Sequence, residues 1–310
     1  MVNGLPPLAL IAGPTASGKS ALAVELARRS NGVIVNADSA QIYCDVPILS
    51  AAPSPEDHAL AEHRLYGIRD GADPCSAADW ASLAKAEIAE IQSAGRLPIL
   101  VGGTGLYLRT LLDGIAPVPP IEPSVRSSVR GAGTAENLAR LVTLDPVAAT
   151  TLNPGDTTRI ARALEVVLST GKTLRAWQSR RTGGIGDRVD LRPIILLPPR
   201  PWLYRRCDRR FETMLDDGAV VEAERLAARH LDPQLPVMRA IGLAELMAFA
   251  AGRMTRAEAL AAGAQSTRRY AKRQYTWFAH QPPADWPRFD RALDEPGAIE
   301  AALALLMRSG

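Results

Sequence analysis

Residues 13–20 read Gly13-Pro14-Thr15-Ala16-Ser17-Gly18-Lys19-Ser20, which satisfies the pattern G-x-x-x-x-G-K-[ST] of a phosphate-binding loop. A continuous apolar run at 8–12 precedes this stretch, and apolar residues at helical spacing follow it. In such a loop the backbone N–H groups and the start of the helix surround a phosphate, while the lysine neutralises its terminal oxygens. All eight residues are therefore predicted to bind a diphosphate or triphosphate, with Ser20 as a ligand of Mg²⁺.

Apolar runs and helical patterns continue to alternate along the next part of the chain. Runs at 33–35 and 97–101 end in the segments Asn36-Ala37-Asp38-Ser39 and Gly102-Gly103-Thr104-Gly105. Between the two runs, Ser76 and Asp79 form a capping-box pattern at the start of a helical stretch. This alternation predicts an α/β fold with a P-loop-type parallel sheet core, helices on both of its faces, and ligands at the carboxyl edge of the sheet.

The composition changes after Gly114. Four prolines follow at positions 117, 119, 120 and 123, and helical patterns without a convincing strand continue to about Gly186. We therefore predict an all-helical insertion domain at 117–188, inside a core formed by 1–116 and 189–310. The core resumes with an apolar run at 194–197, and two basic helices follow it, with the clusters Arg205, Arg206, Arg209, Arg210 and Arg268, Arg269, Lys272, Arg273.

Composition narrows the class of protein. The 310 residues are 47% hydrophobic and carry a net charge of +3, but residues 1–120 hold 8 basic and 12 acidic side chains, whereas residues 121–310 hold 28 and 21. The basic remainder is a weak indication of a polyanionic partner.

Three cysteines far apart imply neither a disulfide framework nor a zinc site. No run reaches the roughly 18 apolar residues of a membrane span, so we expect a soluble, cytoplasmic protein.

Two residues at the predicted sheet edge are candidates for chemistry. Asp38 follows the run at 33–35, where its carboxylate could ligate Mg²⁺, act as a general base, or cap a turn. The run at 97–101 ends in Gly-Gly-Thr, without the acidic metal ligand typical of a nucleotide triphosphatase. Thr104 could therefore be a turn residue or a hydroxyl that faces the substrate.

Several motifs together resemble the tRNA dimethylallyltransferase family, in the order that family has them. The first is the phosphate-binding loop itself. The others are Asp38-Ser39-Ala40-Gln41-Ile42-Tyr43, Val101-Gly102-Gly103-Thr104-Gly105-Leu106-Tyr107, Arg159-Ile160-Ala161-Arg162-Ala163-Leu164-Glu165-Val166, Thr170-Gly171-Lys172, Arg206 with Arg210, Arg239-Ala240-Ile241-Gly242, and Lys272-Arg273-Gln274-Tyr275-Thr276-Trp277. The resemblance covers nearly the whole chain. It departs after Tyr43, where this chain reads 44–53 in place of the family's usual Lys-Gly and Ile-Gly-Thr-Ala-Lys-Pro segments, which affects one phosphate or RNA contact.

The resemblance implies transfer of a dimethylallyl group from its diphosphate to the exocyclic amino group of the adenosine immediately 3′ of the anticodon in tRNA. Asp38 matches the base that must take the proton of this poor nucleophile. Lys19, Thr104 and Arg206 match catalytic residues that stabilise the leaving diphosphate, with Mg²⁺ as cofactor. The residues implied to contact the tRNA anticodon arm are Asp38, Ser39, Ala40, Gln41, Thr104, Arg126, Thr158, Arg159, Ile160, Ala161, Arg162, Arg239, Ala240, Ile241, Gly242, Leu243 and Ala244.

Three other functions share some of these features. An adenylate isopentenyltransferase would modify a free nucleotide, but the helical insertion and the stretch 159–162 favour tRNA. A small-molecule kinase would use the same phosphate-binding loop. In a non-catalytic RNA-binding protein, Lys19 and Asp38 would have no catalytic role. We expect a transferase that acts as a monomer, with tRNA and dimethylallyl diphosphate as its partners.

Overall fold

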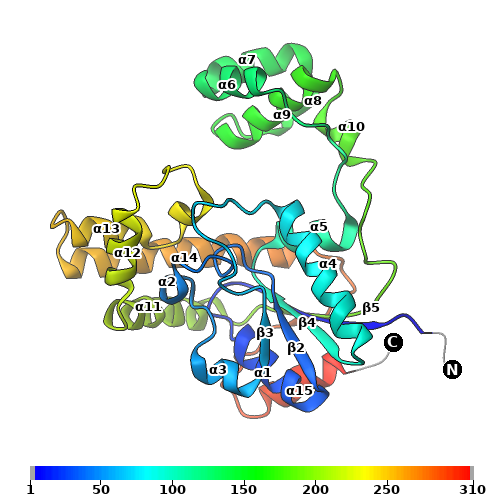
Figure 1. The fold of residues 1–310 in the computed structure, drawn as a ribbon, viewed down its shortest axis with the longest axis vertical. Helices are drawn as coiled ribbons and strands as arrows, with labels where there is room; N and C mark the ends of the chain where they lie inside the picture. The colour runs from blue at the N-terminus through cyan, green and yellow to red at the C-terminus, as the bar shows by residue number, and fades with distance from the viewer. Residues whose placement is uncertain (1–3, 308–310) are drawn as a thin grey trace. The chain divides into compact units, whose positions relative to one another are not determined.

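The computed structural model describes residues 4–307 and consists of two compact units (Figure 1). The first unit comprises Met1–Leu111 and Ile185–Gly310, and the second comprises Leu112–Gly184. Among the described residues, no helix is both long and apolar enough to cross a lipid bilayer.

The first unit is built on a six-stranded sheet with the strand order β3-β2-β4-β1-β5-β6. All five pairings between neighbouring strands are parallel, which confirms the predicted α/β class. The strands are β1 (Pro7–Ala12), β2 (Gly32–Asn36), β3 (Glu62–Arg64), β4 (Leu97–Gly102), β5 (Asp190–Leu196) and β6 (Arg288–Phe289). The four apolar runs of the sequence correspond to β1, β2, β4 and β5.

Helices cover both faces of this sheet, as predicted. On one face, α1 and α15 pack Leu22, Leu26 and Leu303 against alternate strand residues such as Ile11 and Ile99. On the other face lies α4, which buries Trp80, Ala84 and Ile88. The helices of the unit are α1 (Lys19–Ser30), α2 (Pro47–Ser50), α3 (Pro55–Leu60), α4 (Ala77–Ser93), α5 (Gly105–Asp113), α11 (Arg200–Asp216), α12 (Ala219–Ala228), η1 (Pro236–Arg239), α13 (Leu243–Ala250), α14 (Arg256–His280) and α15 (Ala298–Leu306).

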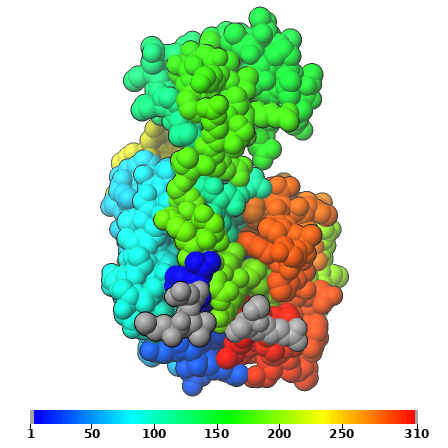
Figure 2. Space-filling view, turned by 90° about the vertical axis from the view of Figure 1, so that its right-hand side faces the viewer, coloured from blue at the N-terminus to red at the C-terminus, as the bar shows by residue number. Residues whose placement is uncertain are grey.

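A capping box starts α4, and an ion pair connects α1 to α15. The Ser76 hydroxyl accepts a hydrogen bond from the Asp79 N–H, and the Asp79 carboxylate accepts one from the Ser76 N–H at 3.0 Å, so the predicted capping box starts α4. Figures 1 and 2 show α15 (red) beside α1 (blue). Arg29 on α1 donates to both carboxylate oxygens of Glu300 on α15, at 2.8 and 2.6 Å, which links the C-terminal helix to α1.

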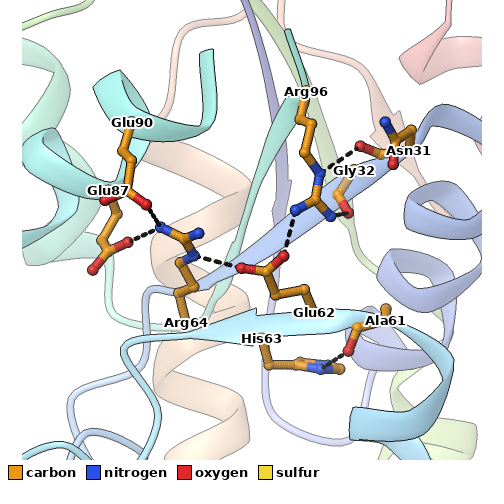
Figure 3. A network of polar contacts seen from close by, with 9 residues as sticks. All are labelled: Asn31, Gly32, Ala61, Glu62, His63, Arg64, Glu87, Glu90 and Arg96. Atoms are coloured by element: carbon orange, nitrogen blue, oxygen red, sulfur yellow. Dashed lines mark hydrogen bonds and ion pairs between the residues drawn. The ribbon is translucent and has the colours of Figure 1, made fainter. Parts of the chain in front are cut away.

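The edge strand β3 is short and charged, and an ion-pair network covers it (Figure 3). Arg64 donates to Glu87 and Glu90 of α4, at 2.8 Å each, and to Glu62 at 2.7 Å. Arg96 also pairs with Glu62 and donates to the Gly32 carbonyl. Charged side chains on an edge strand disfavour pairing with a further strand from another molecule, so the sheet ends here.

The second unit is all-helical, as predicted for an insertion. Its helices are α6 (Pro123–Gly131), α7 (Thr134–Leu144), α8 (Pro146–Thr151), α9 (Thr157–Thr170) and α10 (Leu174–Gln178). Val129, Leu141, Ile160 and Leu164 are fully buried in a separate core between α6, α7 and α9. An antiparallel bridge between Ile115 and Thr182 joins the two ends of the unit.

Candidate active site

The phosphate-binding loop connects β1 to α1 in the strand–loop–helix order that the sequence predicts. Gly13 must be a glycine, since a Cβ there would lie 2.6 Å from the Leu196 carbonyl oxygen. Gly18 adopts φ +95° immediately before α1, which favours glycine again. The first turn of α1 thus begins at Lys19, and the positive end of the helix dipole lies at the loop.

Lys19 is held at the loop in a partly buried position. Its Nζ donates to the Pro14 carbonyl at 2.7 Å. Burial lowers the pKa of Lys19 to about 8, and the neighbouring Asp38 carboxylate opposes this effect. The side chain therefore still carries its proton at neutral pH, where it can neutralise a bound phosphate.

Two arginines of α11 reach the same loop. The Arg206 Nε donates to the Ala16 carbonyl at 3.0 Å, and the Arg210 Nη1 donates to the Thr15 hydroxyl at 3.1 Å. Burial lowers the pKa of Arg210 from its usual value, while Asp38 raises it. The sequence matched Arg210 to a family motif, but only its position at the loop shows that it belongs to the site.

Asp38 lies at the carboxyl end of β2, where the buried Asn36 fixes its backbone. The Asp38 N–H donates to Asn36 Oδ1 at 2.7 Å, and Asn36 Nδ2 donates to the Asp38 carbonyl at 3.0 Å. One Asp38 carboxylate oxygen accepts a hydrogen bond from the Ala40 N–H at 3.0 Å, so the residue also makes the turn that its position allowed. Sequence reasoning missed Asn36, whose role depends on its burial.

Thr104 joins the end of β4 to the segment that carries Asp38. Its hydroxyl accepts from the Ser39 N–H at 3.0 Å and contacts the Ser39 hydroxyl at 3.2 Å. Its own N–H donates to the Ala37 carbonyl at 3.3 Å. This approach requires glycine at position 102, because a Cβ there would lie 2.0 Å from the Ala37 oxygen. Thr104 is thus both the turn residue and a hydroxyl bonded to Ser39, the residue that follows Asp38.

A cavity of about 280 Å³ lies against these groups. Thr15, Asp38, Ser39 and Arg210 provide its polar wall, and its apolar wall includes Leu49, Phe211, Met214 and Tyr270. The cavity therefore offers a cationic end beside the phosphate-binding loop, a carboxylate, and an apolar surface. Such a combination fits a ligand with an anionic head and a hydrocarbon tail.

The candidate tRNA contacts of the first unit lie at cavity-lining, buried or exposed positions. Ala40, Arg239, Ala240 and Ile241 line the cavity, and Gln41 lies beside it in sequence. Gly242 and Leu243 are buried, and a Cβ at Gly242 would lie 2.3 Å from Phe211, so neither offers a side chain to a ligand. Ala244 is exposed on α13.

The candidate contacts of the second unit divide into exposed and buried positions. Arg126, Thr158 and Arg159 are exposed, and Arg162 is partly exposed and pairs with the buried Glu165 carboxylate at 3.7 Å. Ile160 and Ala161 face the core of the unit. Helical spacing turns these two side chains inward, and contact of the segment 158–162 with RNA stays a prediction.

The segment 44–53, where the sequence departs from the family pattern, is anchored on both sides. Gln41 Nε2 donates to the carbonyls of Ser50 and Ala51, at 3.0 and 2.7 Å. The buried Glu222 carboxylate of α12 accepts from the N–H groups of Ile48 and Leu49, at 2.6 and 2.9 Å. Glu222 carries no sequence motif, so sequence reasoning missed it.

The donor set for Mg²⁺ is small. The described residues contain no group of three or more His, Cys, Asp and Glu side chains that could hold a metal ion. Ser20 is exposed in the first turn of α1, next to the loop. Mg²⁺ commonly keeps several waters and binds substrate phosphates through few protein ligands, so these residues fit an ion held mainly by a diphosphate.

Comparisons with known proteins agree with the motifs. A family model described as IPP transferase matches residues 41–281. A protein of Erythrobacter litoralis named tRNA dimethylallyltransferase is 58% identical over 290 residues, covering 92% of each chain. The full-length tRNA isopentenylpyrophosphate transferase of Bacillus halodurans has a similar structure, with a TM-score of 0.68, 33% identity, and 95% and 93% of the two chains covered.

A eukaryotic dimethylallyltransferase that acts on tRNA is also similar, with a TM-score of 0.82 and 25% identity over 97% of this chain and 78% of that one. The match of the family model covers most of this chain, and the sequence relatives span nearly its full length. The chain belongs to the IPP transferase family, the tRNA dimethylallyltransferases.

Proposed function

We propose that this enzyme transfers a dimethylallyl group from dimethylallyl diphosphate to the exocyclic amino group of the adenosine immediately 3′ of the anticodon in tRNA. One observation carries the proposal: Asp38 lines the same cavity as Thr15 and Arg210, which are hydrogen-bonded to each other at the phosphate-binding loop. A base for the acceptor and a cationic site for the leaving group thus lie side by side. The names of the relatives support the same reaction.

In the proposed reaction the adenine amino nitrogen attacks the carbon that carries the diphosphate. The new C–N bond forms as the C–O bond breaks, and the diphosphate leaves with the electron pair. Asp38 takes the proton of the amino group, which is otherwise a poor nucleophile. The hydrogen bond from the Ala40 N–H orients the Asp38 carboxylate for this transfer.

The leaving diphosphate gains negative charge in the transition state, and fixed donors next to that charge lower the barrier. Lys19, Arg206 and Arg210 contribute the positive charge, together with N–H groups of residues 13–20 and the start of α1. Thr104 places its hydroxyl beside Ser39, next to the acceptor. A phosphate-binding loop then serves a leaving group and hydrolyses no nucleotide.

Mg²⁺ would neutralise further charge on the diphosphate when bound. Ser20 is the residue that would hold it, together with the diphosphate itself and water.

The target base must leave the stacked anticodon loop to reach Asp38, as in other enzymes that modify bases. We assign its recognition to Ser39, Ala40, Gln41, Arg239 and Ile241, and backbone binding to the helical insertion 117–188 through Thr158 and through Arg126, Arg159 and Arg162. Most arginine contacts to RNA position phosphates without reading sequence. We also propose that the enzyme acts as a monomer in the cytoplasm.

A direct test supplies radiolabelled dimethylallyl diphosphate with either tRNA or AMP as acceptor. Label transferred to tRNA alone is the expected result. Label on AMP would indicate an adenylate isopentenyltransferase, and consumption of ATP with a small-molecule acceptor would indicate a kinase. Binding of tRNA without product over long incubation would reduce the protein to an RNA-binding role.

A further inference from the structure

Gln274 on α14 forms a bridge between two loops of the candidate site. Its side chain is buried, with the residue 6% exposed. The side-chain oxygen accepts a hydrogen bond from the Thr15 N–H at 2.8 Å, and the side-chain nitrogen donates to the Gly103 carbonyl at 2.9 Å. One amide thus satisfies a donor of the phosphate-binding loop and an acceptor of the segment after β4.

Each end of this bridge is tied to groups that the proposed reaction uses. On one side, the Thr15 hydroxyl accepts from Arg210. On the other side, Gly103 directly precedes Thr104, whose hydroxyl accepts from the Ser39 N–H at 3.0 Å. Hydrogen bonds therefore run from the loop that holds the diphosphate, through Gln274, to the segment that carries Asp38.

Two glycines in the segment after β4 leave space for side chains of α14. A Cβ at Gly103 would lie 2.2 Å from Gln274 Nε2, so only glycine leaves room for the amide at this carbonyl. A Cβ at Gly105 would lie 2.5 Å from the ring of Trp277, one helical turn beyond Gln274. The close packing of α14 against segment 103–105 fixes the position of the amide along the helix.

We propose that Gln274 is a positioning residue that sets the distance between the leaving diphosphate and the acceptor amino group, an inference that rests on the proposed function. A buried amide with both partners in place resists displacement, because moving it leaves polar groups unpaired. Group transfer is sensitive to such displacement, since a shift of about 1 Å in the reacting groups can cost about 100-fold in rate. Gln274 touches neither reacting group and acts through the two loops.

The test compares Gln274→Met with Gln274→Glu. Met has a similar length and no hydrogen-bonding amide, while Glu can still accept from Thr15 but cannot donate to Gly103 when ionised. We expect both variants to lower kcat by about 10- to 100-fold, with the Kd values for inorganic diphosphate and for tRNA changed by less than about threefold. The matched control is Gln92→Met, which removes an amide that donates to Pro7 at 3.0 Å elsewhere in the first unit and should leave kcat unchanged.

A double-mutant cycle isolates the bridge from general packing. Gly103→Ala alone should lower kcat as the Gln274 variants do, because its Cβ displaces the amide. In a Gln274→Ala background the same change should have little further effect, since the next neighbour of that Cβ, the Gly13 carbonyl oxygen, lies 3.2 Å away.

Two results would overturn the inference: normal kcat in folded Gln274 variants, or loss of diphosphate affinity as large as the loss of kcat. Additive effects in the cycle would also contradict it. Failure of the wild-type enzyme to modify tRNA would instead refute the proposed function.

Discussion

At the scale of single residues, Asp38 carries the chemistry. We predict that Asp38→Asn folds normally, because the Asn oxygen can still accept from the Ala40 N–H. It cannot take a proton, so kcat should fall by about 10²–10⁴-fold with little change in KM, as steady-state kinetics with tRNA would show. The exposed Asp285→Asn is the matched control. Partial rescue by raised Mg²⁺ would point to a metal-ligand role, and near-normal turnover would exclude both roles.

The lowered pKa of Lys19 makes diphosphate binding depend on pH. Only the protonated amine attracts the anion, and its pKa in the free enzyme is about 8. Affinity for dimethylallyl diphosphate should therefore be constant below about pH 7 and weaken as the pH rises through 8, by up to about tenfold per pH unit. Lys19→Gln should bind more weakly below about pH 8, where the wild-type amine is protonated, and should lose this dependence. An unchanged pH profile in that variant would assign the titration to another group.

The sequence predicts some of these residues and not others, for a physical reason. Lys19 and Ser20 belong to a contiguous motif whose geometry is local, and Asp38 follows an apolar run that reads as a strand. Asn36 was missed because its function comes from complete burial. Gln274 bonds to residues 259 and 171 positions away, and no local pattern specifies such contacts.

At the scale of secondary structure, the carboxylate of Glu222 stabilises the short helix α2. It accepts two backbone N–H bonds, and hydrogen bonds to a charged group contribute about 1.5–3 kcal/mol each. Glu222→Leu should lower the free energy of unfolding by about 2–4 kcal/mol in urea denaturation, because those donors stay buried without a partner. Glu224→Leu, at an exposed position of the same helix, is the control. Equal stability of both variants would show that α2 does not depend on this contact.

The sequence predicts four of the strands and misses β3 and β6. β1, β2, β4 and β5 each contain a continuous apolar run of at least three residues that is mostly buried in the sheet, so their patterns are strong. β3 and β6 span only three and two residues, and β3 consists of Glu62, His63 and Arg64. An edge strand of polar residues has no alternation to detect, and its position depends on pairing with β2.

At the scale of the whole molecule, the second unit should contribute electrostatic binding of RNA. Arg159 is exposed and Arg162 partly so on α9. Arg159→Ala and Arg162→Ala should each weaken the binding of many tRNAs alike. Each should also reduce the slope of log K against log salt concentration by about one. Filter binding across a salt series would measure this, with Arg140→Ala of α7 as the charge-matched control. Equal slopes in all three variants would remove α9 from the RNA interface.

Gln41 should behave differently from these arginines. Its side-chain nitrogen is occupied by the Ser50 and Ala51 carbonyls, which leaves the oxygen of the amide for recognition. The loss caused by Gln41→Ala should therefore differ between tRNAs with different anticodon loops. Measurement of kcat/KM for two tRNAs of different loop sequence would show this. A uniform loss across tRNAs would instead assign Gln41 to support of segment 44–53.

The most direct test of the proposed reaction is mass spectrometry of tRNA after incubation with the enzyme, Mg²⁺ and dimethylallyl diphosphate, followed by nuclease mapping of the modified position. We predict one added dimethylallyl group, on the adenosine immediately 3′ of the anticodon, and none with the Asp38→Asn variant over the same time. Unmodified tRNA, or a dimethylallyl group on any other nucleotide, would contradict the assignment of this cavity to that transfer.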